Sequence, residues 1–170
     1  MISSTTPQWV AVYTRSRAEK QVAERIEELG LEVYLPIVEQ RRIWSDRVKL
    51  VRVPLFPSYL FVKITYADAE KVRFVDGVSY IVRRNDILPI PDEQIDAVRR
   101  FLSAKQEVFV HDSLALHKGA HAVITGGPFE NLRGTLVSDC KDGNFSIRID
   151  AIGLSLVTTI DRLLLQPVKG

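Results

Sequence analysis

Three histidines, the residue type most often found as a metal ligand, lie within a short stretch of the sequence at positions 111, 117 and 121. His117 and His121 have the i, i+4 spacing that would place both imidazoles on one face of a helix, where they could share a zinc ion. Gly119 lies between them, however, and a β-like run follows His121, so a helix is not expected here. The sequence therefore favours histidines that do not bind a metal.

Other catalytic patterns are equally weak. Cys140 is the single cysteine and has no histidine near it in the sequence, which argues against a catalytic thiol. The segment 126–128 is Gly-Gly-Pro and lacks the Lys-Ser/Thr that completes a phosphate-binding loop. No paired carboxylates stand out. We therefore expect a binding protein rather than an enzyme, without a catalytic residue, metal or cofactor.

A basic run gives a more useful signal. Residues 39–52 carry five Lys or Arg and two Asp or Glu, a net charge of +3 (5 − 2), whereas the whole chain has a net charge of only +2. Such a run can contact phosphate groups, which would suit a nucleic-acid-binding surface. A solvated face of an ordinary hairpin explains the same charges, and the sequence leaves both interpretations open.

The whole chain has the size and composition of a folded protein. Its 170 residues, of which 46% are hydrophobic, suit one ordinary domain or two small ones. The sequence contains no apolar run of the ~18 residues that a membrane helix needs, and residues 1–8 lack the features of a signal peptide. A single cysteine fits a reducing compartment. We expect a soluble cytoplasmic protein without membrane contact.

The first part of the chain predicts alternating strands and helices. Ser16 and Glu19 have the spacing of a capping box, and the apolar residues that follow recur at helical spacing. Thr65 and Asp68 have capping-box spacing before a second helix, and Pro91 suits the first turn of a third. Strands are expected at residues 9–14, 32–36, 58–64 and 78–83, with an exposed hairpin over 37–53 and a turn at 45–46. This order favours an α+β sandwich, with helices on a mostly antiparallel sheet.

The second part of the chain has a different pattern. Residues 104–117 have no clear period and are interpreted as a linker between a first domain at 8–103 and a second at 118–170. Five short β-like segments follow, at 121–125, 133–139, 144–149, 154–160 and 164–168. Five strands in so few residues predict a small β-barrel, a closed sheet that leaves no exposed edge.

These segments resemble a known family. The first part is similar to the N-terminal domain of NusG-like transcription elongation factors, chiefly in the string Pro-Leu-Phe-Pro-Ser-Tyr-Leu-Phe-Val at residues 54–62, with the 9–14 strand and its helix, the strand at 33–36, Gly77-Val78 and Ile90-Pro91. The second part resembles a KOW module at Lys118-Gly119, Val123-Ile124, Gly127-Pro128-Phe129, Asn131-Leu132 and Gly134. KOW modules also occur in ribosomal proteins, so a ribosome- or RNA-binding KOW protein without polymerase contact is the alternative.

Within this family, the basic segment 41–49 is most similar to the UpxY-type antiterminators of capsular-polysaccharide operons, with RfaH a more distant specialised relative. The resemblance implies a factor that binds the clamp helices of the largest RNA polymerase subunit and favours processive elongation. Such docking needs exposed aromatic side chains within a polar rim. The matching positions are Tyr13, Phe56, Pro57, Phe61, Ile95 and Val98, although each could instead belong to the hydrophobic core.

Specialised members of the family also read the non-template DNA strand. The basic residues at matching or neighbouring positions are Arg15, Arg17, Lys20 and Arg25, and the hairpin adds Arg41, Arg42, Trp44 and Arg47 as a candidate contact with upstream duplex or polymerase. Ordinary solvated charges are the alternative. Two base-reading positions of RfaH fall on Val75 and Asp76, which argues against transferring its sequence specificity.

For the KOW module, the resemblance implies a ribosomal protein or a termination factor as partner, with Phe129 as the best anchor.

Overall fold

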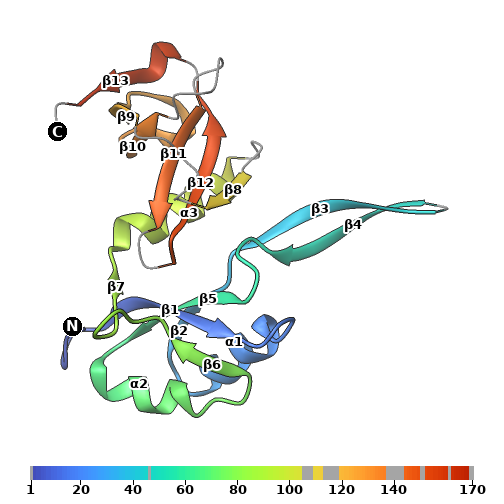
Figure 1. Cartoon of the computed structure of the whole chain (residues 1–170), viewed down its shortest axis with the longest axis vertical. Helices are drawn as coiled ribbons and strands as arrows, with labels where there is room; N and C mark the ends of the chain where they lie inside the picture. Colours follow the sequence, from blue (N-terminus) through green and yellow to red (C-terminus); the bar gives the residue numbers. More distant parts are fainter. Residues whose placement is uncertain are drawn as a thin grey trace. The chain divides into compact units, whose positions relative to one another are not determined.

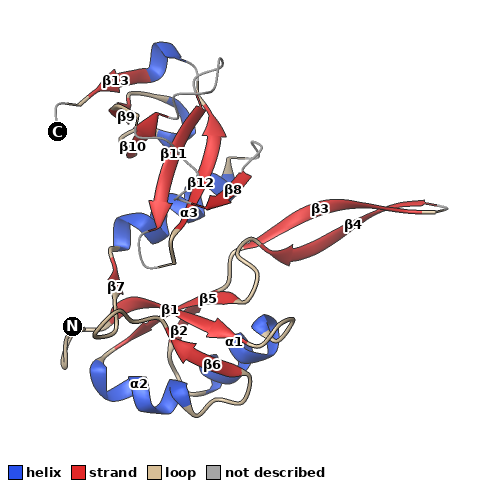
Figure 2. Ribbon diagram, viewed as in Figure 1, coloured by secondary structure: helices blue, strands red, loops and turns tan. Residues whose placement is uncertain are grey.

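The computed structural model describes residues 2–45, 47–104, 109–112, 119–136, 144–149, 152–160 and 162–168. It is a mixed α+β structure, as the sequence predicts, and it divides into two compact units, Met1–Pro91 and Asp92–Gly170 (Figures 1 and 2). The sequence placed the end of the first domain at residue 103. The division after Pro91 instead assigns the third helix to the second unit.

The first unit is built on a five-stranded antiparallel sheet. The strands run in the order β2-β5-β1-β6, and β7 also pairs with β1. The elements of this sheet and its helices are β1 (Gln8–Thr14), α1 (Glu19–Glu28), β2 (Glu32–Tyr34), β5 (Tyr59–Ile64), α2 (Tyr66–Arg73), β6 (Val78–Ile81) and β7 (Pro89–Ile90). Each of the predicted strands and both predicted helices of this part of the chain is therefore present.

The two faces of this sheet have different roles, because successive side chains of a strand point to opposite faces. The even-numbered residues of β1 and β5 pack into the hydrophobic core with residues of α1 and α2; this core includes Val10, Val12, Leu60, Val62 and Ile64 together with Val22, Ile26 and Val72. The odd-numbered residues form the opposite face, where Trp9 pairs with Lys63, Ala11 with Phe61 and Tyr13 with Tyr59. The second face therefore carries all four aromatic side chains of these two strands, Trp9, Tyr13, Tyr59 and Phe61.

A hairpin extends away from this sheet as a two-stranded ribbon (Figure 1). Its strands are β3 (Ile37–Trp44) and β4 (Arg47–Pro54), paired antiparallel from Ile37 opposite Pro54 to Trp44 opposite Arg47. This confirms the exposed hairpin predicted over residues 37–53. Of the predicted turn, Ser45 is described and Asp46 lies outside the described residues.

The two predicted capping boxes have different outcomes. Before α2, the amide and hydroxyl of Thr65 donate to Asp68 Oδ2 at 3.2 and 2.7 Å, which confirms the box. The box predicted from Ser16 and Glu19 is wrong, because α1 begins at Glu19 itself, after Ala18. The Glu19 carboxylate is buried and accepts a hydrogen bond from the Ser58 amide at 2.7 Å. Glu19 therefore bonds to a residue distant in the sequence instead of capping the start of its own helix.

Among its described residues, the second unit contains one α-helix and a six-stranded antiparallel sheet in the order β13-β9-β10-β11-β12-β8. Its elements are α3 (Asp92–Ser103), β8 (Phe109–Asp112), β9 (His121–Ile124), β10 (Arg133–Leu136), β11 (Asn144–Ile149), β12 (Leu154–Thr159) and β13 (Leu165–Pro167), with 3-10 turns at Gly127–Phe129 and Arg162–Leu164. The five predicted strands are present. An additional strand, β8, lies in the predicted linker at 104–117 and pairs with β12.

The sheet of the second unit is an open path among the described residues, where no pairing joins β13 to β8. The closed five-stranded barrel therefore stays a prediction.

None of the helices in the described ranges has both the length and the apolar character needed to cross a membrane.

Candidate protein- and nucleic-acid-binding surfaces

Aromatic rings gather on the second face of the first unit's sheet. The Tyr13 ring lies 5.0 Å from Tyr59 in an edge-on arrangement and 5.0 Å from Tyr80 in a stacked one. We refer to these three residues as the tyrosine cluster. Tyr13 and Tyr59 are half-buried, whereas Tyr80 is 49% exposed. The cluster thus joins three strands and presents both ring surface and hydroxyl groups to solvent.

The tyrosine cluster also alters the acidity of one of its members. Burial raises the pKa of the Tyr59 phenol above its usual value of 10.0, and the neighbouring Tyr80 and Tyr13 groups raise it further, Tyr80 also through a hydrogen bond. The Tyr80 and Tyr13 hydroxyls are therefore close enough to raise the pKa of Tyr59.

The residues predicted for polymerase docking fall into two groups. Tyr13 is half-buried in the tyrosine cluster and Pro57 is exposed. The remaining four are fully buried, namely Phe56, Phe61, Ile95 and Val98. Phe61 packs edge-on against Phe56 at 5.9 Å and stacks with Tyr34 at 6.3 Å, so these rings extend the aromatic face inward.

Sequence reasoning missed Tyr59 and Tyr80. Tyr59 could have been found, because it lies two residues before Phe61 along β5 and its side chain is therefore on the same face of the sheet. Tyr80 could not, because the pairing of β1 with β6 is irregular between Tyr13 and Thr14. The alternation of side chains along β6 alone therefore does not predict that Tyr80 lies beside Tyr13.

Two of the four basic residues predicted on and before α1 are paired with a carboxylate. Arg25 Nη1 lies 3.1 Å from Asp76 Oδ2 and donates to the Asp76 carbonyl oxygen at 2.6 Å. Arg15 Nη2 donates to the other carboxylate oxygen of Asp76. All three side chains remain solvent-exposed, but the carboxylate neutralises part of their positive charge.

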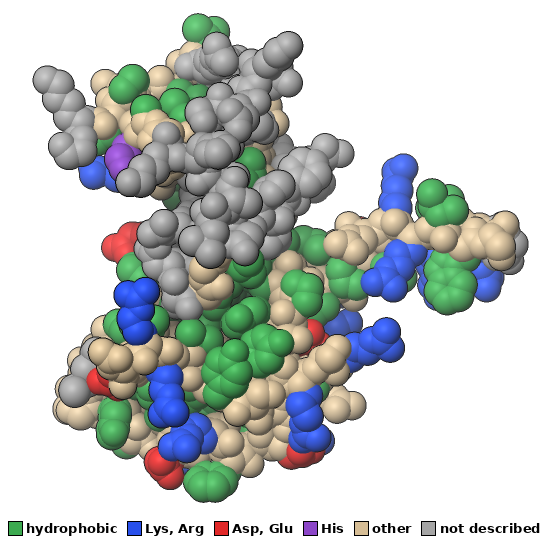
Figure 3. All heavy atoms as spheres, viewed as in Figure 1, with side chains coloured by type: hydrophobic (Ala, Val, Ile, Leu, Met, Phe, Trp, Pro, Cys, Tyr) green, Lys and Arg blue, Asp and Glu red, His purple; other side chains and the backbone are tan. Residues whose placement is uncertain are grey.

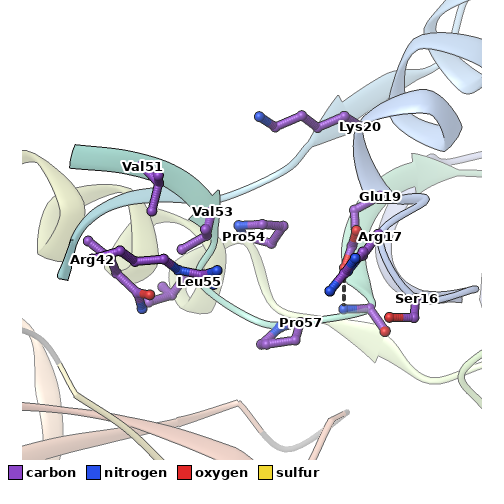
Figure 4. A pocket seen from close by; sticks show the side chains of 12 residues that line it. Ser16, Arg17, Glu19, Lys20, Arg42, Val51, Val53, Pro54, Leu55 and Pro57 are labelled. Carbon is purple, nitrogen blue, oxygen red and sulfur yellow. Dashed lines mark hydrogen bonds between the residues drawn. The ribbon is translucent and has the colours of Figure 1, made fainter. Parts of the chain in front are cut away.

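The other two, Arg17 and Lys20, line a cleft of about 610 Å³ between the start of α1 and the base of the hairpin. Figure 4 shows Lys20 extending from α1 toward the hairpin, where Arg42 lies beside Val53 and Leu55. The dashed hydrogen bond from Ser58 to Glu19 lies on the α1 side of the cleft (Figure 4). The cleft therefore combines basic and apolar side chains.

The hairpin has two chemically different faces, because residues opposite each other in the register share a face. The basic face carries Gln40, Arg42 and Trp44 on β3 and Arg47, Lys49, Val51 and Val53 on β4. The other face, called the aliphatic face after its tip, carries Arg41, Ile43, Val48 and Leu50, with Glu39 opposite Arg52 nearer the sheet. Trp44 is 58% exposed and Ile43 85% exposed, so neither face is covered near the tip. Figure 3 shows the basic and hydrophobic side chains on this ribbon.

Of the predicted hairpin residues, Arg42, Trp44 and Arg47 thus share the basic face, whereas Arg41 lies on the other. Sequence reasoning named these residues but not Lys49, which the register places opposite Arg42. The alternation of basic residues along β4 was the signal that could have identified it.

In the second unit, Phe129 is buried and packs against Phe101 with ring centres 4.7 Å apart. Arg100 donates hydrogen bonds to the carbonyl oxygens of Pro128 and Glu130 at 2.9 and 2.6 Å. The predicted partner anchor therefore contributes to the interior of its own unit.

The histidine and cysteine candidates contribute no site to the described structure. His117 and Cys140 lie outside the described residues, and the structure describes His111 only as backbone in β8. The ring of His121 contacts the Thr135 hydroxyl, with Nδ1 and Oγ1 3.4 Å apart. Within the described ranges, His, Cys, Asp and Glu side chains form no group that could hold a metal ion.

Comparison with known proteins agrees with the architecture. The family model described as "Transcription termination factor nusG" matches residues 7–99, more than half of the chain. The termination/antitermination protein NusG of Rickettsia typhi is 25% identical over 81% of this chain and 77% of its own length. The termination/antitermination protein NusG of Thermus thermophilus is 25% identical over 91% of this chain and 95% of its own length.

A solved structure, "Domain interaction in Thermotoga maritima NusG", has a similar fold, with a TM-score of 0.55 and 22% identity over 98% of this chain and all of that one. Since the family model covers the sheet with the tyrosine cluster, both arginine–Asp76 pairs and the hairpin, these features lie in the part of the chain that carries the family's signature. The chain therefore belongs to the NusG family of transcription termination and antitermination factors.

Proposed function

We propose that this NusG-family chain is a specialised, operon-specific paralogue of the capsular-polysaccharide type that binds RNA polymerase in the cytoplasm and promotes processive elongation. The observation that carries the proposal is the tyrosine cluster, a partly exposed aromatic surface on the sheet of the first unit. Protein interfaces concentrate their binding energy in such aromatic groups.

The proposed contact is with the clamp helices of the largest polymerase subunit. Tyr13 and Pro57 are the accessible members of the predicted docking set, and Tyr59 and Tyr80 enlarge the surface around Tyr13. The buried Phe56 and Phe61 would support this surface from the interior rather than contact the partner. Ile95 and Val98 are buried on α3 of the second unit and would affect docking only by stabilising that unit.

Binding alone is sufficient for this function. A factor that binds an elongating polymerase more tightly than a paused one shifts the population toward elongation, and no catalytic group is needed. This agrees with a family of transcription factors that are not known enzymes.

The specialised role rests on the basic hairpin. The basic face of the hairpin, Arg41 on its other face and the cations near α1 would contact nucleic acid at the transcribing polymerase, either the non-template DNA strand or upstream duplex. The proposed contacts are Arg15, Arg17, Lys20, Arg25, Arg41, Arg42, Trp44 and Arg47. We also propose that the second unit is a KOW module that binds a ribosomal protein or a termination factor, with Phe129 as a structural residue at its turn.

In vitro transcription on pausing and terminating templates tests the proposal. The full chain should increase readthrough, and Tyr13→Ala should reduce the increase at least severalfold, because it removes the central ring of the cluster. Tyr66→Ala is the matched control, since Tyr66 is also a tyrosine, is 56% exposed and lies on α2 outside the cluster.

Affinity for purified polymerase, measured with the same variants, separates binding from later steps. A folded Tyr13→Ala chain that binds polymerase and promotes readthrough like the unmodified chain would contradict the proposal. A chain that binds ribosomes or RNA but not polymerase would favour the alternative of a KOW protein without polymerase contact.

A further inference from the structure

Ser58 has a backbone conformation that is unfavourable for serine. It is the third residue of a turn from Phe56 to Tyr59, which the Tyr59 amide closes by donating to the Phe56 carbonyl oxygen at 3.0 Å. Its φ is +64°, whereas the ring of Pro57 keeps the second residue of the turn at a negative φ. This combination defines a type II turn, whose third position usually carries glycine or asparagine. Other contacts must therefore hold Ser58 in place.

Two buried residues hold the backbone of Ser58, one at its amide and one at its carbonyl group. The Glu19 carboxylate, in the first turn of α1, accepts a hydrogen bond from the Ser58 amide at 2.7 Å, which Figure 4 draws as a dashed line. The Ser58 carbonyl oxygen accepts from the Thr14 amide at 2.8 Å and from the Thr14 hydroxyl at 3.4 Å. Glu19 is 6% exposed and Thr14 is fully buried. We refer to Glu19, Ser58 and Thr14 as the Ser58 anchor.

The Ser58 anchor adjoins the tyrosine cluster. Thr14 directly follows Tyr13 along β1, and Ser58 directly precedes Tyr59 at the start of β5. Tyr13 and Tyr59 are paired in the register of these strands, with their rings 5.0 Å apart. On its other side Ser58 follows Pro57, which is exposed. Both accessible members of the predicted docking set, Tyr13 and Pro57, therefore lie next to a residue of the anchor.

A second turn conformation is available to the same residues. A type I turn also accepts proline at its second position, but it gives the third residue a negative φ, which suits serine better. The two turns differ by a rotation of the peptide group between Pro57 and Ser58. Because this rotation points the Ser58 N–H away from Glu19, it would leave a buried carboxylate without that partner, which is unfavourable. The hydrogen bond to Glu19 thus selects the type II turn and, with it, the direction of the Pro57 carbonyl group.

We propose that Glu19 is a positioning residue for polymerase docking, because its hydrogen bond to Ser58 keeps the turn in the conformation that presents Pro57 and Tyr59 to the partner. Glu19 itself is buried and does not contact the partner. The proposal rests on the proposed function in assigning polymerase to the tyrosine cluster. It adds a residue outside that surface that determines what fraction of the chain is competent to dock.

Two substitutions separate the hydrogen bond of Glu19 from its charge. Glu19→Gln removes the charge but keeps an acceptor oxygen at the same reach, whereas Glu19→Asp keeps the charge on a side chain that is one methylene shorter. We expect Glu19→Gln to bind purified polymerase like the unmodified chain. Glu19→Asp should lower the affinity about five- to tenfold, because losing the hydrogen bond from Ser58 reduces the population of the type II turn. Glu24→Asp is the matched control, at an exposed glutamate of the same helix.

A substitution at Ser58 tests the turn itself. Glycine adopts a positive φ without the strain that serine incurs, so with glycine the type II turn no longer depends on Glu19. Adding Ser58→Gly to Glu19→Asp should therefore restore most of the lost affinity for polymerase. Ser58→Gly alone should bind like the unmodified chain. A double variant that binds as weakly as Glu19→Asp would contradict the role of the turn.

Fluorine NMR of the chain labelled with fluorotyrosine follows the tyrosine cluster without polymerase. The chain has five tyrosines, whose signals are assigned with single Tyr→Phe variants. Glu19→Asp should shift the signals of Tyr13 and Tyr59, which adjoin the Ser58 anchor, and leave the signal of Tyr66 on α2 unchanged. Adding Ser58→Gly should move the shifted signals back toward their original positions. This readout would not respond to a loss of stability alone while the chain remains folded.

The outcomes distinguish this proposal from the proposed function. Weak polymerase binding by Tyr13→Ala together with unchanged binding by Glu19→Asp would overturn the positioning role alone. Equal losses in Glu19→Gln and Glu19→Asp, or a loss confined to Glu19→Gln, would also overturn it, because the charge rather than the hydrogen bond would then matter. Unchanged binding by both Tyr13→Ala and Glu19→Asp would contradict the proposed function, and shifted fluorine signals in Glu19→Asp would then still support Glu19 as the residue that positions Tyr13 and Tyr59.

Discussion

Asp76 accepts hydrogen bonds from Arg25 through both its carboxylate, with Oδ2 3.1 Å from Nη1, and its backbone carbonyl oxygen, 2.6 Å from the same nitrogen. The other carboxylate oxygen accepts from Arg15. A loop residue next to β6 thereby holds two arginines that the sequence assigned to nucleic-acid binding. In this position Asp76 competes with any phosphate for the same guanidinium groups.

Replacing Asp76 should therefore strengthen nucleic-acid binding. Asp76→Asn removes the competing charge and should raise affinity for a 12-nucleotide single strand two- to tenfold, with a steeper salt dependence as additional phosphates are contacted. Folding stability should change by less than about 1 kcal/mol, because exposed ion pairs contribute little. Asp96→Asn, which breaks an exposed pair on α3, is the control and should have no effect on binding. Unchanged or weaker binding by Asp76→Asn would contradict the competition.

The sequence predicted the elements of the first unit well, because their signals are local. Alternation along β1 and β5 determines which residues share a face, and the spacing of Thr65 and Asp68 determines a helix start. The same spacing failed at Ser16 and Glu19, where the Ser58 amide, from a distant part of the chain, takes the carboxylate. Local spacing does not reveal a competing partner that only the fold brings close.

The candidate site was less predictable for the same reason. The cleft joins residues of α1 to both strands of the hairpin, and Asp76 reaches Arg15 and Arg25 across a large separation in sequence. Sequence reasoning therefore listed the right cations but could not distinguish Arg17 and Lys20, which face the cleft, from those paired with Asp76. It also chose Phe56 and Phe61 for docking, although burial leaves them without exposed surface.

The capping box before α2 predicts a pH-dependent contribution to stability. Hydrogen bonds from Thr65, and then from Lys71, hold the pKa of the partly buried Asp68 below its usual value. Because the folded-state pKa is depressed, the stabilisation is present above the unfolded pKa of about 3.9 and is lost as pH falls through the folded value.

Asp68→Asn should accordingly lower the free energy of unfolding by about 0.5–2 kcal/mol at pH 7. The difference from the unmodified chain should shrink as the pH falls below about 4. Urea unfolding at pH 7 and at pH 3 measures both values. A difference of the same size at both pH values would show that the loss does not come from the carboxylate's charge.

The tyrosine cluster predicts sensitivity to alkaline pH. Burial, followed by Tyr80 and Tyr13, raises the pKa of Tyr59 above 10.0 in the folded protein. The unfolded chain therefore ionises first, and stability should decline as pH rises from about 10 through the folded pKa. Tyr59→Phe should flatten this part of the stability–pH curve in urea unfolding, whereas Tyr66→Phe, at an exposed tyrosine, should leave it unchanged. Equal curves for Tyr59→Phe and the unmodified chain would exclude Tyr59 as the cause.

Gly77 should be the most sensitive position in the loop that carries Asp76. Its φ of +100° is unfavourable for other residues, and an added Cβ would lie 2.6 Å from Val22 Cγ2 in α1. Gly77→Ala should therefore cost about 2–4 kcal/mol, combining left-handed strain with overpacking. Gly30→Ala is the matched comparison, because Gly30 also has a positive φ but no atom lies within 4 Å of an added Cβ. It should cost only about 1 kcal/mol of strain. Thermal unfolding of the two variants measures the difference, and equal losses would mean that α1 yields to the added methyl group.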